Sequence, residues 1–283
     1  MPKGRDQASE QALANLSALP HFESFSEHRR RSGALVSAAA PPHSPRTLCV
    51  LGAGNCFDLD LSELTRCYDA VHLVDIDGQA LERSFARQDR ATQARLVLHA
   101  SVDLSGFLDR IDRWARLEVT PEELMNHANA TARTLREQLG GPFDVVLSAC
   151  MLSQMQLSVV NVLGERHRLF EAVRWTLNLT HFRALAALTR PSGSALFLTD
   201  VSAGQLHALN ALAPDTDYLA LVQELSSTGA VFDFADPKRL TELFHDDPVL
   251  RKAFQAFDVK DAWSWSNGPE TQFLVYASEL RRV

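Results

Sequence analysis

Two features in residues 48–77 could act together on one ligand. The first is a Gly-Ala-Gly-Asn turn at residues 52–55, directly after an apolar run. Glycine has no Cβ, so the backbone of such a turn can come close to a bound molecule. The second is Asp75, which ends the next apolar run roughly 20 positions later, where a carboxylate can accept hydrogen bonds from ribose hydroxyls. Together they indicate a site for an adenosine group.

The residues after the glycine turn indicate which adenosine compound would fit. A dinucleotide site uses the pattern GxGxxG, but here the third glycine position is Phe57. Asp58 and Asp60 follow near the start of the next helix, and their charges would repel a pyrophosphate. The chain also lacks the GxxxxGK[ST] pattern of a P-loop. A cationic adenosine cofactor without phosphate, S-adenosylmethionine, fits this pattern better.

The elements that must position these residues alternate along the chain. From residue 47 onward, short and fully apolar runs are separated by longer helical segments, which predicts a mostly parallel sheet covered by helices on both faces. Helices are expected at 77–88, with Asp77 as its cap, and at 170–188, where Pro191 and Gly193 stop it. Two strands joined around residues 267–269 (Asn-Gly-Pro) are expected at the end. The apolar runs lie at 47–52, 70–75, 94–100, 143–149 and 194–200.

The N-terminal segment predicts a separate part of the molecule. Residues 1–45 have helical patterning and end in the stiff connector PPHSP. We expect a helical cap or lid over the carboxyl edge of the sheet, where open α/β folds bind ligands. His21, His28 and the arginines at 29–31 would then lie near the site. The alternatives are a helical pair packed elsewhere and a solvated face for 28–31.

Residues 47 to about 201 resemble a class I S-adenosylmethionine-dependent methyltransferase. Five segments match in order: VLGAGN, VHLVDID, HASVDLSG, GPFDVVLSACMLSQM and PSGSALFLTD. The resemblance implies a Rossmann-like, mostly parallel seven-stranded sheet with a C-terminal antiparallel hairpin. The core would span 46–283, with helical insertions near 105–142 and 202–261. Two positions depart from the family pattern, because Val50 replaces an acid and Cys56 replaces a glycine.

The resemblance also implies which residues bind the cofactor. The glycine turn would hold the methionine end, Asp75 the ribose, and residues after the second and third strands the adenine. Blander interpretations remain: a plain turn for the glycines, a backbone-bonded Asp75, and a helix cap for Asp103. The implied cofactor-binding residues are Gly52, Ala53, Gly54, Asn55, Asp75, Ile76, Val102, Asp103, Ser148 and Ala149.

Catalysis by methyl transfer is an in-line displacement that depends above all on alignment. No residue set in the sequence dictates a base. The polar candidates are Gln154 and Ser153 after the fourth apolar run, and His28 in the N-terminal segment. No HxxxH, HExxH or clustered Cys/His spacing occurs, so we expect no metal. A GxSxG hydrolase pattern is absent as well.

Charge and composition limit the classes of partner that the protein is expected to bind. The net charge is −7, from 28 basic and 35 acidic residues, which disfavours a nucleic-acid acceptor. No apolar run approaches the ~18–20 residues that cross a bilayer, so we expect no membrane partner and a cytoplasmic location. The long insertions favour an enclosed pocket and a small-molecule acceptor, although a peptide also fits. A cofactor-binding regulator, a non-methylating enzyme on the same fold and a nicotinamide reductase are the alternatives.

Overall fold

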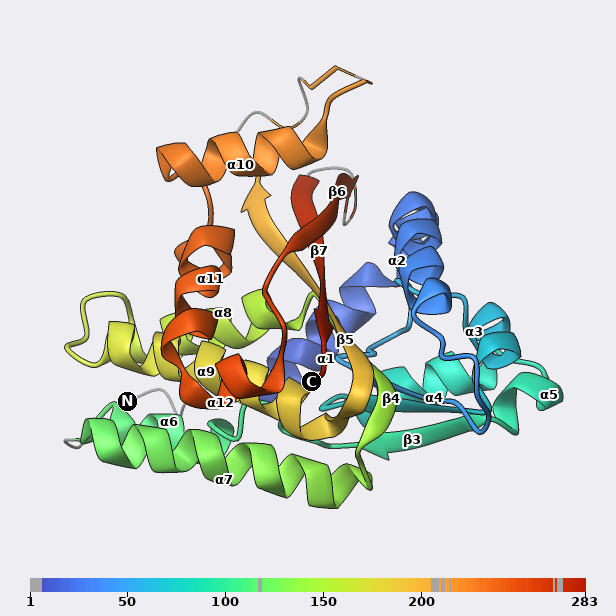
Figure 1. The fold of residues 1–283 in the computed structure, drawn as a ribbon, viewed down its shortest axis with the longest axis horizontal. Coiled ribbons are helices and arrows are strands. Elements are labelled where there is room, and N and C mark those ends of the chain that lie inside the picture. Colours follow the sequence, from blue (N-terminus) through green and yellow to red (C-terminus); the bar gives the residue numbers. More distant parts are fainter. Residues whose placement is uncertain are drawn as a thin grey trace.

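The computed structural model is built on one seven-stranded sheet (Figure 1). It describes residues 7–116, 119–204, 209, 212–213, 215–266, 268 and 272–283. The strand order is β3-β2-β1-β4-β5-β7-β6, and only β7 runs against the others. This confirms the expected Rossmann-like fold with its C-terminal antiparallel hairpin. The strands are β1 Thr47–Leu51, β2 Ala70–Asp75, β3 Leu96–Ala100, β4 Phe143–Ala149, β5 Thr189–Ala203, β6 Val259–Ser266 and β7 Gln272–Arg281.

The central strands are apolar throughout because both faces of the sheet are buried. On β1, Leu48 and Val50 join one apolar cluster, whereas Cys49 and Leu51 join the other. Helices α2 (Ser26–Ala38), α3 (Leu61–Cys67) and α4 (Gly78–Ala86) contribute to the first cluster. Helices α7 (Pro121–Leu139), α8 (Met151–Leu163) and α9 (Phe170–Leu188) contribute to the second. Each face of the sheet therefore has its own helical layer.

The first insertion is helical and contains α6 (Leu108–Trp114) and α7. Pro121 is the first residue of α7, and Thr120 and Glu123 close a capping box there. Helix α9 ends at Leu188, before Pro191 and Gly193, as expected, and both residues lie inside β5, where the register with β4 shifts. Asn267 and Pro269 of the hairpin turn lie outside the described residues. The remaining helices are α1 Gln7–Ala18, η1 Leu19–Phe25, α5 Arg90–Gln93, α10 Tyr218–Thr228, η3 Asp233–Ala235, α11 Pro237–Asp246 and α12 Pro248–Ala253.

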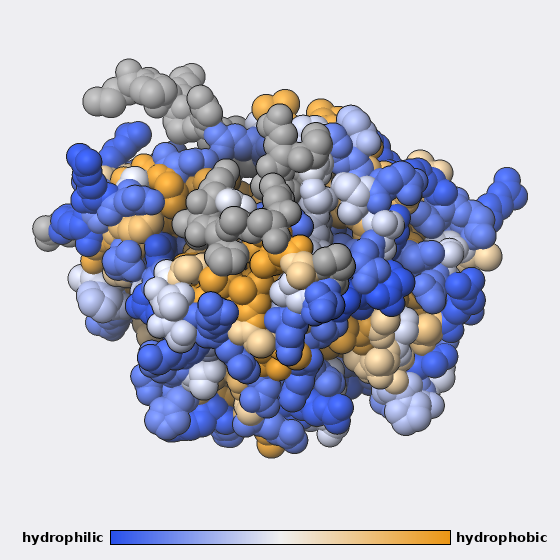
Figure 2. All heavy atoms as spheres, turned by 90° about the horizontal axis from the view of Figure 1, so that it is seen from above, coloured by the Kyte–Doolittle hydropathy of each residue, from blue (hydrophilic) through white to orange (hydrophobic). Residues whose placement is uncertain are grey.

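The second insertion begins with α10 near the carboxyl ends of β5 and β6, and α11 and α12 then run toward the opposite end of the sheet, where Phe254 pairs with Arg282 after β7. In Figure 1, α10 crosses above these strand ends. Figure 2 looks onto this end and shows apolar side chains gathered near its centre, beside residues drawn in grey.

Candidate functional site

The glycine turn is held against the second strand. The N–H groups of Gly52 and Ala53 both donate to the carbonyl of Val74, at 2.9 and 3.1 Å. Gly52 has φ +76° and Gly54 has φ +46°, conformations that favour glycine. A Cβ on Gly52 would stand 2.0 Å from the Sδ of Met151, so the surface of the turn is in close contact with α8. The turn thus has the shape of a cradle with no room for a side chain.

Asp75 lies directly beside this turn and is buried. Its Oδ2 accepts from the N–H of Gly54 and its Oδ1 from the N–H of Asp77, both at 2.8 Å. Burial raises the pKa of this carboxyl. Asp75 is therefore bonded to the backbone, as one of the alternatives predicts. A carboxylate has about four acceptor sites, so it can still accept hydrogen bonds from a ligand.

A mostly apolar pocket opens next to Asp75. Its walls come from the segments that follow β2, β3 and β4, so it lies at the carboxyl edge of the sheet, together with α6 and α8. Four of the predicted residues border it, as does Gln154. The pocket is lined by Gln11, Asp75, Ile76, Val102, Asp103, Leu104, Ser105, Phe107, Leu108, Ile111, Met151, Gln154, Met155, Ser158 and Val159.

Two aspartates that follow β2 and β3 accept hydrogen bonds from backbone N–H groups of nearby turns. Asp77 accepts from the N–H groups of Gln79 and Ala80, which confirms it as the N-cap of α4. Asp103 accepts from the N–H and hydroxyl of Ser105 and, through its other oxygen, from the N–H of Leu108. These bonds fix the turn before α6, but the helix begins at Leu108 with Phe107 as its N-cap, so Asp103 does not cap a helix that starts near Leu104.

The end of β4 divides its side chains between the two faces of the sheet. The hydroxyl of Ser148 is 2.8 Å from Nε2 of His181 on α9, in a buried contact. Ala149 belongs to the apolar cluster on the opposite face. Neither residue lines the pocket, so any contact of Ser148 with a ligand would have to use its backbone.

An acidic pair that the sequence analysis did not single out as a site lies near the glycine turn. Asp200, near the end of β5, accepts from Nε1 of Trp265 at 3.1 Å and from the hydroxyl of Ser153 at 3.0 Å. Burial raises its pKa to about 6. Burial, and then the charge of Asp200, raise the pKa of Asp58 to about 7. The sequence contains a sign of this site, because Asp200 ends the apolar run at 194–200 in the same way that Asp75 ends the run at 70–75.

His28 lies between this pair and the aromatic side chains of β6. Its Nδ1 accepts from Nε1 of Trp263 at 2.9 Å, which leaves Nε2 to carry the proton, 3.4 Å from Oδ1 of Asp58. Burial lowers the pKa of His28 to about 3, and its ring stacks on Trp265. With Nδ1 engaged and Nε2 protonated, His28 has no free lone pair to act as a base.

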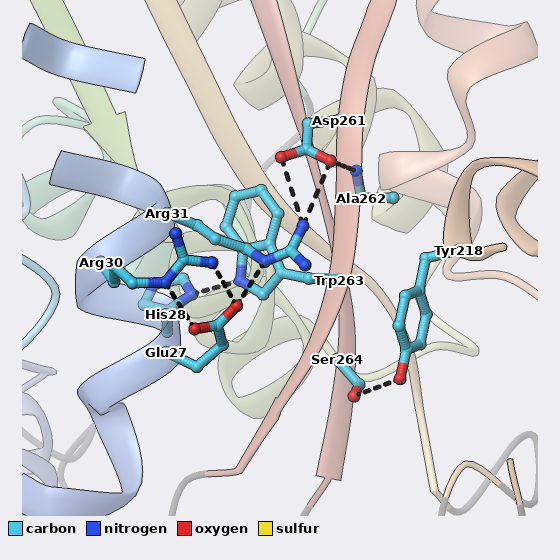
Figure 3. A network of polar contacts seen from close by, with 9 residues as sticks. All are labelled: Glu27, His28, Arg30, Arg31, Tyr218, Asp261, Ala262, Trp263 and Ser264. Atoms are coloured by element: carbon cyan, nitrogen blue, oxygen red, sulfur yellow. Dashed lines mark hydrogen bonds and ion pairs between the residues drawn. The ribbon is translucent and has the colours of Figure 1, made fainter. Parts of the chain in front are cut away.

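Helix α2 is anchored to β6 by side chains on both elements (Figure 3). Besides the bond from Trp263 to His28, Arg31 lies 3.4 Å from Asp261. Both tryptophans of β6 thus pack against α2, where their rings contact His28. Only Arg30 of the basic run is well exposed, so the solvated-face interpretation of residues 28–31 is wrong for His28 and Arg31.

We predict that Asp58→Asn stabilises the protein more at pH 8 than at pH 5. The raised folded pKa means that Asp58 adds stability below its unfolded pKa, near 4, and loses it as the pH rises through about 7. The asparagine amide carries no charge at either pH, so the variant does not lose the stability that ionisation of Asp58 costs. We expect the unfolding midpoint at pH 8 to rise by roughly 2–4 °C, the shift that about 1 kcal/mol causes in large domains.

Thermal unfolding at both pH values tests this expectation, with the exposed Asp246→Asn as the matched control. A shift of equal size at pH 5 and pH 8, or a loss at pH 8, would contradict it.

Two absences hold for the part of the chain that the structure describes. Within that part of the chain, no three His, Cys, Asp or Glu side chains are grouped so that they could hold a metal ion. Among the same residues, no helix combines the length and apolarity needed to cross a bilayer.

Comparison with known proteins yields structural likenesses only. No model of a protein family matches the chain, and no curated protein matches its sequence. An rRNA methylase from Streptococcus thermophilus is 10% identical, with TM-score 0.40, over 88% of this chain and 93% of its own. Magnesium protoporphyrin IX methyltransferase from Synechocystis PCC 6803 is 11% identical, with TM-score 0.41, over 90% and 83%. A SAM-dependent methyltransferase from Aquifex aeolicus is 7% identical, with TM-score 0.43, over 88% and 89%. Likenesses this distant carry no argument about activity, which depends on the site itself.

Proposed function

We propose that this protein transfers a methyl group from S-adenosylmethionine to a small-molecule acceptor, without a metal. The observation that carries the proposal is the apolar pocket at the carboxyl edge of the sheet, which is bordered by Asp75, the carboxylate that also accepts from the N–H of Gly54 in the glycine turn. A buried carboxylate beside an apolar slot suits a nucleoside, whose ribose is polar and whose base is flat and apolar on its faces.

The residues at the site fit this cofactor. The cradle of Gly52, Ala53, Gly54 and Asn55 lets the methionine end approach the backbone. Asp75 would hold the ribose, and Ile76 and Val102 would pack on the adenine beside Asp103. Ala149 and the backbone of Ser148 would lie under the cofactor. When bound, the cofactor supplies a methyl group on a cationic sulfur.

The acceptor side of the site would be polar and acidic. Ser153 and Asp200 lie at the ends of α8 and β5 that face this edge, and Asp58 adds a second carboxyl. Carboxyl groups whose pKa lies near neutrality can take a proton from a nucleophile at working pH. Neither carboxyl borders the pocket, but Asp200 accepts from Ser153, whose neighbour Gln154 does. On this geometry we assign proton acceptance to Asp200, with Asp58 as the second candidate, and orientation to Ser153 and Gln154.

Two measurements test the proposal against its alternatives. S-adenosylhomocysteine should raise the unfolding midpoint, whereas NADH should not; the reverse would favour a nicotinamide reductase. Labelled methyl transfer into a metabolite extract, followed by mass spectrometry, should yield a labelled product. Cofactor binding without any labelled product, in nucleic acid and peptide pools as well, would favour a regulatory protein or a different reaction.

We predict that a chelator leaves the methylation rate unchanged. Positioning and local carboxyl groups are sufficient for an in-line displacement, so no step requires a divalent ion. Rates measured with EDTA, and with EDTA followed by Mg²⁺, should agree within error. Loss of activity in EDTA that Mg²⁺ restores would contradict this mechanism.

We predict that the N-terminal segment acts as a lid whose moving part is α1 with η1. Helix α2 is tied to β6, and its Val36 carbonyl accepts from the hydroxyl of Tyr68 at 2.6 Å. S-adenosylhomocysteine should therefore slow hydrogen exchange in residues 7–25 and leave residues 28–38 protected to the same extent. Equal exchange of residues 7–25 with and without the ligand would contradict a lid.

A further inference from the structure

Helix α1 presents an unusual face to the rest of the molecule. Its leucines face outward, with Leu13 66% exposed and Leu16 45% exposed. Gln11 and Asn15, one turn apart on the same side, are partly buried. A helix that covered the core only for stability would turn its leucines inward. Polar contacts, not apolar burial, therefore decide how α1 is oriented.

Asn15 connects α1 to two turns at the carboxyl edge of the sheet. Its side-chain Nδ2 donates to Oδ2 of Asp77 at 2.9 Å. Its backbone carbonyl accepts from Nδ2 of Asn55 at 2.7 Å. Its Oδ1 lies 3.1 Å from the point where a Cβ on Gly54 would stand. The carboxamide oxygen therefore lies directly over the glycine cradle, where it can accept from a cationic group.

Gln11 lies one helical turn before Asn15 on the same side of α1, and its side chain borders the pocket. It lines the same cavity as Asp75, Met151 and Gln154. A side-chain amide has both a donor and an acceptor, so beside Asp75 it can meet hydroxyl groups in either role. Farther along, Oε2 of Glu10 accepts from Nδ2 of Asn161 at 3.3 Å, which ties this end of α1 to α8.

We propose that α1 is a wall of the cofactor site, with Gln11 contacting the ribose and Asn15 contacting the cationic methionine end. The inference rests on the proposed function and extends it to residues outside the sheet. The outward leucines follow from this role, because the polar side of the helix is needed at the ligand. Asn15 has a second task, since it also holds Asp77 and Asn55 in place.

Calorimetric titration with two probes tests each assignment. S-adenosylhomocysteine has both the adenosine and the amino-acid end, whereas adenosine has only the first. Gln11→Ala should weaken binding of both probes at least about fivefold. Asn15→Ala should weaken S-adenosylhomocysteine at least about fivefold and leave adenosine within twofold. Leu13→Ala, on the outer face, is the matched control and should bind both probes like the unmodified protein.

The outcomes separate this inference from the function itself. Failure of the unmodified protein to bind S-adenosylhomocysteine would overturn the proposed function. If the unmodified protein binds normally and both Gln11→Ala and Asn15→Ala bind as tightly or more tightly, α1 does not contact the cofactor and only covers the sheet. An equal loss for both probes in Asn15→Ala would overturn its place at the methionine end. Thermal unfolding of each variant confirms that it is folded.

Discussion

Replacing Asp75 by alanine is expected to weaken S-adenosylmethionine binding at least about tenfold, the equivalent of 1.4 kcal/mol. Hydrogen bonds to a charged acceptor contribute roughly 1.5–3 kcal/mol each, and the ribose diol would donate to this carboxylate. The change also removes the acceptor of the N–H groups of Gly54 and Asp77, so the cradle itself would loosen. Calorimetric titration of the folded variant gives the loss directly.

Asp89→Ala is a suitable control for this experiment. Asp89 is also a carboxylate at the start of a helix and accepts from the backbone N–H of Thr92, but it is exposed and does not line the pocket. Its removal should lower stability slightly and leave the affinity unchanged. Unchanged affinity in a folded Asp75→Ala variant would remove Asp75 from the site.

Replacing Gly52 by valine is expected to weaken cofactor binding at least about a hundredfold, or about 2.8 kcal/mol. The left-handed conformation at φ +76° is strained for any side chain, and the new Cβ would stand 2.0 Å from Sδ of Met151. Met151 also borders the pocket, so a rotation that relieves this contact would change the shape of the pocket. Both the valine and the displaced Met151 would occupy space that the cofactor needs.

Gly229 offers a control for the backbone strain. It has φ +72° at the end of α10, and nothing lies within 4 Å of the position of its Cβ. Gly229→Val should lower stability through strain alone, with binding unchanged. If Gly52→Val and Gly229→Val lose stability equally and both bind normally, the glycine turn has only a local structural role.

The sequence by itself determined the sheet and one side of the site. Fully apolar runs indicate buried strands, because the side chains on both faces of such a strand pack against helices. The pattern can be recognised within five to seven residues. The positions of the glycine turn and Asp75 were also predictable, since the turn follows β1, Asp75 ends β2, and parallel strands bring their carboxyl ends to one edge. The bounds of β2, β4 and α9 follow the sequence pattern residue for residue.

Only the tertiary structure decided the partners of the polar side chains. Asp200 meets Trp265 and Ser153, and His28 meets Trp263, across separations of 47 to 235 residues. The orientation of α1, with Asn15 inward and Leu13 outward, is likewise opposite to what its own apolar pattern favours. Apolar burial is non-directional and can be predicted from composition along a short segment. A hydrogen bond requires a particular donor within about 3 Å of a particular acceptor, and only the packed chain brings those atoms together.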